Sequence, residues 1–214
     1  MGKSLNKTQR LATSGIFLAL GTILSLVTFF RLPYGGSVTL FAMVPVMLLG
    51  YMYGAKWGVL CGTVYGILQA VLGITVSSAL AGMDVFSAAA MVALDYLVAF
   101  AVLGLAGCLK KAVKKPVLAF TLGCFVACLL RFGTHVLSGV LLFGQYAEWY
   151  FSQESFTLGA AILERFSGLA LVTVYSVIYN GSYMLPETVL SVIMGGLLMS
   201  VKPIRKICAE QFTI

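Results

Sequence analysis

Six long apolar stretches, separated by short polar segments, organise this chain. They cover residues 11–30, 38–53, 57–76, 87–109, 116–143 and 166–201. An α-helix needs about 20 mostly apolar residues to cross a bilayer, so the pattern predicts six membrane helices. The last stretch is too long for one straight span, and we expect Pro186 to kink it. The pattern therefore predicts an all-α integral membrane protein, with one domain of six transmembrane helices over residues 1–214.

Composition supports this assignment. The 214 residues are 60% hydrophobic and only 10% charged, with a mean hydropathy of +1.01, whereas a soluble domain has about 25% charged residues. The first apolar stretch is long enough to span, so we expect a retained helix and not a cleaved signal peptide. The sequence has no G-x-x-x-x-G-K-[ST] nucleotide-binding motif. If transport is driven by ATP, another chain must supply the ATPase.

Charge is distributed asymmetrically between alternate polar segments. One set holds eleven of the fourteen basic residues: Lys3, Lys7, Arg10, Lys56, Lys110, Lys111, Lys114, Lys115, Lys202, Arg205 and Lys206. The other set holds the acidic residues Asp84, Glu148, Glu154 and Glu164. Cytoplasmic loops are enriched in Lys and Arg, so both termini are predicted to be cytoplasmic. The anionic inner leaflet accounts for the net charge of +7, and no nucleic-acid partner is needed.

Polar side chains gather in the outer half of the predicted bundle. The segment 131–146 contains the only histidine, His135, together with Arg131 and Ser138. Ionisable groups at membrane depth are costly, so they mostly face a bundle interior or a cavity. Asp95 and His135 each fall about 12 Å from the outer end of their stretch, at 1.5 Å per helical residue. This distribution predicts a cavity open to the outside, because a pore would need similar groups in the inner half.

The residue types indicate which ligand such a cavity binds. Asp95 places a negative charge at low dielectric, where a cation is the natural partner, and His135 and Asn180 each donate and accept hydrogen bonds. Flat side chains lie near the outer surface: Tyr34, Phe143, Tyr146, Trp149, Tyr150 and Tyr175. Aromatic faces attract cations. The set therefore predicts a site for a flat, cationic heterocycle.

Structural roles remain open for the same residues. Asp95 and Arg131 are candidates for a buried ion pair that fixes helix register, and His135 is a candidate for a simple hydrogen bond between helices. Tyr175 and Asn180 are five residues apart, about 140° around an ideal helix. They meet one ligand only if it lies across the helix or if the helix is irregular.

Small residues form two further patterns. Gly15 and Ala19 make a small-xxx-small pair, which serves equally to pack a helix within the bundle or to dock it on a partner. Cys124 and Cys128 are one turn apart without other ligands nearby in the sequence, so packing is favoured over a metal site. The five cysteines do not predict a disulfide framework.

Several motifs together resemble a known family. They are Leu32-Pro33 with GGSVT at 35–39, Trp57-Gly58, LDYLVAF at 94–100, RFGTHVLSG at 131–139, FGQYA at 143–147 and YNGSYMLPE at 179–187. The chain resembles, over nearly its whole length, the thiamine-specific substrate-binding (S) component of energy-coupling factor (ECF) transporters, the ThiT family.

The resemblance implies a protein of the bacterial cell membrane that binds thiamine near the outer face. It implies as partners a transmembrane coupling subunit and two ATPase subunits, with no cofactor and no catalytic residue. By position it assigns substrate-binding roles to Asp95, His135, Phe143, Tyr175 and Asn180. Some family members have tryptophan at the position of Phe143 and glutamate at that of Asp95, so the resemblance does not fix the depth of the pocket or the ligand pose. Gly15 and Ala19 match the family's docking surface for the coupling subunit. With Tyr34 and Tyr146, these assignments complete the predicted site.

Three rival functions follow from the same residues. One is a self-sufficient, proton-linked secondary transporter of a small cation that uses Asp95 and His135. Another is an S component for a different vitamin, although Asp95 argues against an anion. The third is an intramembrane hydrolase using Ser138 or Ser182, for which no G-x-S-x-G elbow is present.

Overall fold

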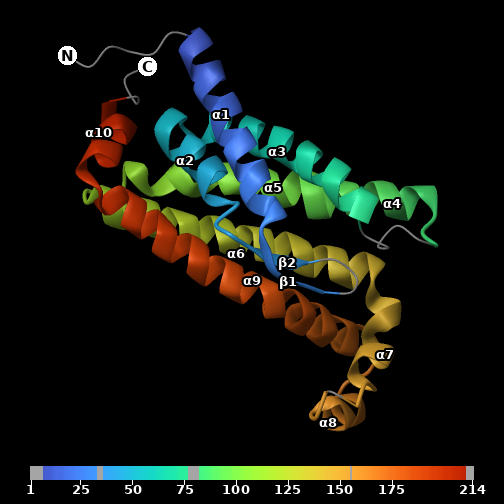
Figure 1. The fold of residues 1–214 in the computed structure, drawn as a ribbon. Helices are drawn as coiled ribbons and strands as arrows, with labels where there is room; N and C mark the ends of the chain where they lie inside the picture. The colour runs from blue at the N-terminus through green and yellow to red at the C-terminus, as the bar shows by residue number, and fades with distance from the viewer. Residues whose placement is uncertain (1–6, 33–35, 77–81, 155, 211–214) are drawn as a thin grey trace.

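The computed structural model describes residues 7–32, 36–76, 82–154 and 156–210 (Figure 1). The described part is a helical bundle with one small β-hairpin. Its helices are α1 (Lys7–Leu26), α2 (Val44–Tyr53), α3 (Ala55–Val76), α4 (Val85–Met91), η1 (Val92–Val98), α5 (Ala99–Ala101), η2 (Val102–Lys110), α6 (Pro116–Leu142), η3 (Gly144–Tyr146), α7 (Ala147–Phe151), α8 (Gly159–Arg165), α9 (Gly168–Ser200) and α10 (Lys202–Glu210). Its strands are β1 (Thr28–Arg31) and β2 (Ser37–Thr39).

The all-α membrane architecture predicted from the sequence is confirmed. Among the described residues, five helical segments are long and apolar enough to cross a bilayer: α1, α3, residues 85–110, α6 and α9. The second predicted span, 38–53, contains only the ten-residue helix α2, about 15 Å long at 1.5 Å per residue. Nine of those ten residues are buried, as expected for a helix that is apolar on every side.

A β-hairpin replaces the predicted end of the first span and the start of the second. Thr28 pairs with Thr39 and Arg31 with Ser37 in antiparallel register, so α1 ends at Leu26 and α2 begins only at Val44. The paired segments are rich in β-branched and aromatic residues, which favour strands. In Figure 1 the hairpin follows the end of α1, and β2 contacts both α1 and α9.

The fourth span changes its winding along its length. It begins as α-helix, widens to a π-helix over Val92–Val98, and tightens to a 3₁₀ helix over Val102–Lys110. Both forms are unusual at this length, and π turns are often found at functional sites. Glycines allow close backbone contact with the neighbouring helices: a Cβ on Gly104 would lie 2.0 Å from the carbonyl carbon of Gly58. The glycine contacts fix the inner half of this span against α2 and α3.

The longest helix, α9, runs 33 residues and continues through Pro186 as one helix. It spans about 50 Å at 1.5 Å per residue, more than a bilayer core requires, and packs along α6. The start of α1 and the whole of α10 lie at one end of the bundle, whereas α7 and α8 lie at the other (Figure 1). This arrangement fits both termini on one side of the membrane.

Candidate functional site

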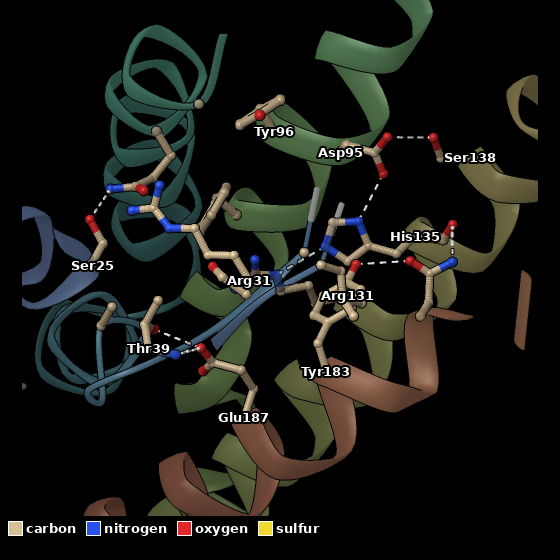
Figure 2. Close-up of a pocket in the computed structure, with 18 of the residues that line it drawn as sticks. Ser25, Arg31, Thr39, Asp95, Tyr96, Arg131, His135, Ser138, Tyr183 and Glu187 are labelled. Atoms are coloured by element: carbon tan, nitrogen blue, oxygen red, sulfur yellow. Dashed lines mark hydrogen bonds and ion pairs between the residues drawn. The ribbon is translucent and has the colours of Figure 1, made fainter. Parts of the chain in front are cut away.

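A cavity of about 330 Å³ lies between the hairpin, α3, the fourth span, α6 and α9. All five elements contribute polar groups to its lining, among them Asp95 on the fourth span, His135 on α6, and Asn180 and Glu187 on α9. Figure 2 shows Asp95, His135 and Glu187 converging from helices that are far apart in the sequence. The structure therefore brings together the acid, the histidine and the amide predicted from the sequence.

Asp95 is held by two hydrogen bonds from α6. Its Oδ1 lies 2.8 Å from His135 Nδ1, and its Oδ2 accepts a hydrogen bond of 2.6 Å from Ser138 Oγ. The side chain of Asp95 nevertheless keeps 18% of its surface exposed, against 8% for His135. The carboxylate is thus fixed in direction while one face remains open to the cavity (Figure 2).

Arg131 determines the protonation pattern of the histidine. Its Nε donates to His135 Nε2 at 3.2 Å, so Nε2 is the acceptor of the ring. A neutral imidazole carries its proton on the other nitrogen, and Nδ1–H therefore donates to Asp95. The predicted alternative of a direct Asp95–Arg131 ion pair does not form; the guanidinium lies over the Phe100 ring, 4.2 Å from its centroid.

Asn180 and Tyr175 both line the cavity although they are five residues apart on α9. The Asn180 side chain donates to the backbone carbonyls of Ser176 at 2.9 Å and His135 at 3.2 Å, and accepts from the Tyr183 hydroxyl at 2.8 Å. These bonds join α9 to α6 at the cavity wall. Asn180 is therefore mainly committed to positioning, whereas Tyr175 offers its ring.

Aromatic rings form one side of the cavity. The lining includes Phe143, Tyr175, Tyr179 and Tyr183, and the Tyr183 ring packs edge-on against His135 with centroids 5.9 Å apart. Tyr146 does not line the cavity in the described structure; it lies beside Phe143 with ring centroids 6.5 Å apart. Tyr34 lies outside the described residues.

Behind these rings, α7 closes the outer end of the bundle. Tyr150 packs edge-on against Tyr175, with centroids 5.3 Å apart, and contacts Tyr179 at 5.9 Å. Burial raises the pKa of Tyr150 above its ordinary value. Its side chain is therefore a neutral phenol at physiological pH. Within the described residues, no group of three or more His, Cys, Asp or Glu side chains is arranged to hold a metal ion.

Comparison with known proteins identifies the family. The family model described as thiamine transporter protein matches residues 11–156. The thiamine transporter ThiT of Bacillus subtilis (strain 168) is 31% identical over 206 residues, covering 91% of this chain and 92% of the relative. This chain belongs to the thiamine transporter family. A solved structure of ThiT from Listeria monocytogenes shares the fold, with a TM-score of 0.66 at 20% identity over 95% of this chain and 99% of that one.

Membership in the thiamine transporter family makes this chain a multi-pass bacterial membrane transporter and not an enzyme. The apolar helices long enough to span a bilayer agree with that class.

The sequence analysis missed the contribution of the hairpin to the cavity. Glu187 Oε1 on α9 accepts hydrogen bonds from the backbone N–H of Thr39 at 2.5 Å and from its Oγ1 at 2.6 Å. Both residues line the cavity, as does Arg31 on β1 (Figure 2). The strand-favouring composition of residues 28–31 and 37–39 is the sequence feature that could have predicted the hairpin.

The small residues Gly15 and Ala19 lie on the outward face of α1. Gly15 and Ala19 are both exposed, and a Cβ added to Gly15 would meet no atom within 4 Å. The pair therefore does not pack against another helix of this chain, which was one of the two roles predicted for it.

Proposed function

We propose that this chain captures thiamine from outside the cell in the cavity around Asp95 and serves as the substrate-binding subunit of an ECF transporter. The observation that carries the proposal is the Asp95 carboxylate, held by His135 and Ser138 with one face open to a cavity walled by aromatic rings. Thiamine is proposed as the ligand because the family description and the name of the B. subtilis relative both specify thiamine transport.

The chemistry of thiamine matches this wall. Its thiazolium ring is a permanent cation, so a carboxylate in a low-dielectric cavity attracts it without needing a proton transfer. Phe143, Tyr175 and Tyr179 offer faces for stacking and cation–π attraction. Arg131 is turned toward His135 and Phe100, so its positive charge supports the histidine and is directed away from the Asp95 carboxylate.

The proposal requires partner subunits, because the sequence contains no nucleotide-binding motif. ATP-driven uptake therefore requires ATPase subunits and a membrane subunit that couples them to this chain. The exposed face of α1 with Gly15 and Ala19 supports docking of the coupling subunit, because small residues allow two helices to approach closely.

Equilibrium titration of the purified chain with thiamine tests the binding role. Asp95→Asn keeps the size of the side chain but removes its charge, and a charge-assisted interaction contributes about 1.5–3 kcal/mol. We expect thiamine affinity to fall roughly 10- to 100-fold.

The matched control is Asp84→Asn, which makes the same change at an exposed site outside the cavity, where asparagine still caps α4. Its affinity should equal that of the parent chain. Parental affinity in a folded Asp95→Asn sample would refute the charge role. Equally tight binding of biotin, an anion, would instead favour an S component for a different vitamin.

A further inference from the structure

A second, smaller cavity lies at the opposite end of the bundle from α7 and α8. It measures about 150 Å³ and is lined by Lys110, Lys114 and Arg205, together with Tyr51 and Met199 among others. We propose that it binds the phosphodiester head group of an anionic phospholipid in the cytoplasmic leaflet. This inference does not depend on the identity of the transported solute.

Three separate elements supply the cations. Lys110 ends the fourth span, Lys114 lies in the connection before α6, and Arg205 lies on α10. The described residues that line the cavity include no acidic side chain. Positive charges that the fold holds around one small space repel each other, and an anion placed between them removes that repulsion.

Lys110 is fixed in position at the cavity wall. Its Nζ donates to the backbone carbonyls of Tyr51 at 3.1 Å and Cys208 at 3.0 Å, and lies 4.6 Å from the centroid of the Tyr51 ring. These contacts tie α10 against α2 and the fourth span. The cavity is therefore built by tertiary contacts and is more than a cluster of mobile surface lysines.

A long helix also begins at this cavity. Pro116 lines it and is the first residue of α6, which runs for 27 residues. The Lys115 side chain makes no capping hydrogen bond at this end. Proline has no backbone N–H, so this helix end contributes the positive end of the helix dipole, which favours an anion and adds to the attraction of the three side chains.

The level of the cavity favours a lipid over a soluble partner. The lining residues lie where the spans end: Lys110 closes one span, Pro116 opens the next, and Met199 is one residue from the end of α9. Exposed leucines lie within a turn of them, Leu118 on α6 and Leu197 on α9. A phospholipid places phosphate at this level and acyl chains along such leucines, and basic pockets between helices on the cytoplasmic side suit anionic head groups.

Native mass spectrometry of the detergent-purified full chain tests the site. Phosphatidylglycerol, phosphatidylcholine with the same acyl chains, and inorganic phosphate would be titrated separately. We expect phosphatidylglycerol to remain bound to the parent chain in preference to the other two. The double variant Lys114→Gln/Arg205→Gln should weaken phosphatidylglycerol binding roughly 30-fold, because each juxtamembrane cation contributes a factor of about 5.

The matched control removes two neighbouring charges that do not line the cavity, Lys115→Gln/Lys202→Gln, and should bind within a factor of about 2 of the parent. Equal losses in the two double variants would overturn the site in favour of general surface attraction. Equal retention of phosphatidylcholine would overturn head-group recognition. Displacement of the lipid by inorganic phosphate would assign the cavity to a free anion, and no retention of phosphatidylglycerol would leave the basic cluster to an acidic protein partner.

Discussion

Arg131, His135 and Asp95 form a chain of hydrogen bonds in which each side chain directs the next. The guanidinium occupies one ring nitrogen, which places the proton on the other nitrogen and aims it at the carboxylate. Ser138 binds the second carboxylate oxygen. Because the imidazole is neutral in this arrangement, the negative charge of Asp95 is oriented but not cancelled, and it remains for a cationic ligand.

We predict that Glu187 stabilises the hairpin through its hydrogen bonds with Thr39. Its Oε1 accepts two hydrogen bonds from Thr39. Glu187→Ala leaves a buried N–H without its partner and should lower the free energy of unfolding by about 1–3 kcal/mol. Glu187→Gln keeps an acceptor oxygen and should cost clearly less. Denaturant unfolding in detergent measures both, and equal losses would show that the Thr39 contact does not stabilise the hairpin.

The sequence predicted much of the cavity wall but not its hairpin side. Asp95 and His135 stood out because ionisable residues are rare in apolar helices. Thr39 carried no such signal, since a threonine near a predicted loop is ordinary. Tyr146 shows the opposite case: an aromatic residue near the outer surface was predicted to bind substrate, and the structure places it beside Phe143, away from the cavity lining.

At the level of elements, the two halves of the fourth span have different roles, one in the cavity and one in helix packing. Its π-helical part presents Asp95 to the cavity, whereas its 3₁₀ part packs its backbone against α2 and α3 through Gly50, Gly58 and Gly104. Close packing of this kind leaves no room for a side chain. The position of the acid is thus supported by contacts made several turns away.

Gly104→Ala tests that support. A Cβ at this position would lie 2.0 Å from the Gly58 carbonyl carbon and 2.3 Å from its oxygen, so the helices must separate. We expect a loss of about 3 kcal/mol or more in the free energy of unfolding.

Gly133→Ala is the control, because a Cβ there meets nothing within 4 Å on a regular helix. It should be neutral or stabilising by up to about 1 kcal/mol. A Gly104→Ala protein as stable as the Gly133→Ala protein would contradict the packing role. Thermal unfolding in detergent provides the comparison.

Apolar runs predicted the long helices well, except at the hairpin between the first two spans. The ranges expected for the third, fourth and fifth spans agree with α3, residues 85–110 and α6 within three residues at each end. The first two spans were placed wrongly at the hairpin, because an apolar β-strand and the end of an apolar helix give the same hydropathy. The periodicity needed to separate them is too short in segments of three or four residues.

At the scale of the whole molecule, charge and architecture indicate the same orientation. The start of α1 and the whole of α10 lie at the end rich in Lys and Arg, and α7, which contains Glu148, lies at the other (Figure 1). By the positive-inside rule the basic end faces the cytoplasm. The cavity around Asp95 then lies toward the exterior, as uptake of an external solute requires.

Cysteine labelling on intact cells tests this orientation. Glu154→Cys should react with a membrane-impermeant maleimide, because Glu154 is exposed in the predicted outer loop. Lys111→Cys, also exposed but at the basic end, should react only after the cells are permeabilised. The parent chain, whose cysteines lie in helices at Cys61, Cys108, Cys124, Cys128 and Cys208, provides the background. The reverse pattern would invert the topology.

The need for partner subunits separates the proposal from a self-sufficient transporter. If the proposal holds, proteoliposomes containing only this chain should bind thiamine but not accumulate it, with or without a proton gradient, because the proposed energy source is ATP hydrolysis by separate subunits. Addition of a coupling subunit and ATPases with ATP should start accumulation. Accumulation driven by a proton gradient with this chain alone would favour the secondary-transporter alternative.

The wide π turn at Val92–Val98 makes the position of the acid independently adjustable. Such a turn holds one residue more than an α-helical turn, and each helical residue rotates the chain by about 100°. Deleting a single residue between Asp95 and Ala99 would shorten this wide turn and rotate the carboxylate to another side of the helix, while Gly104 kept its contact with Gly58. A change of one residue in this turn is therefore the smallest alteration that would release the acid from His135 and Ser138 and present it to a differently placed ligand.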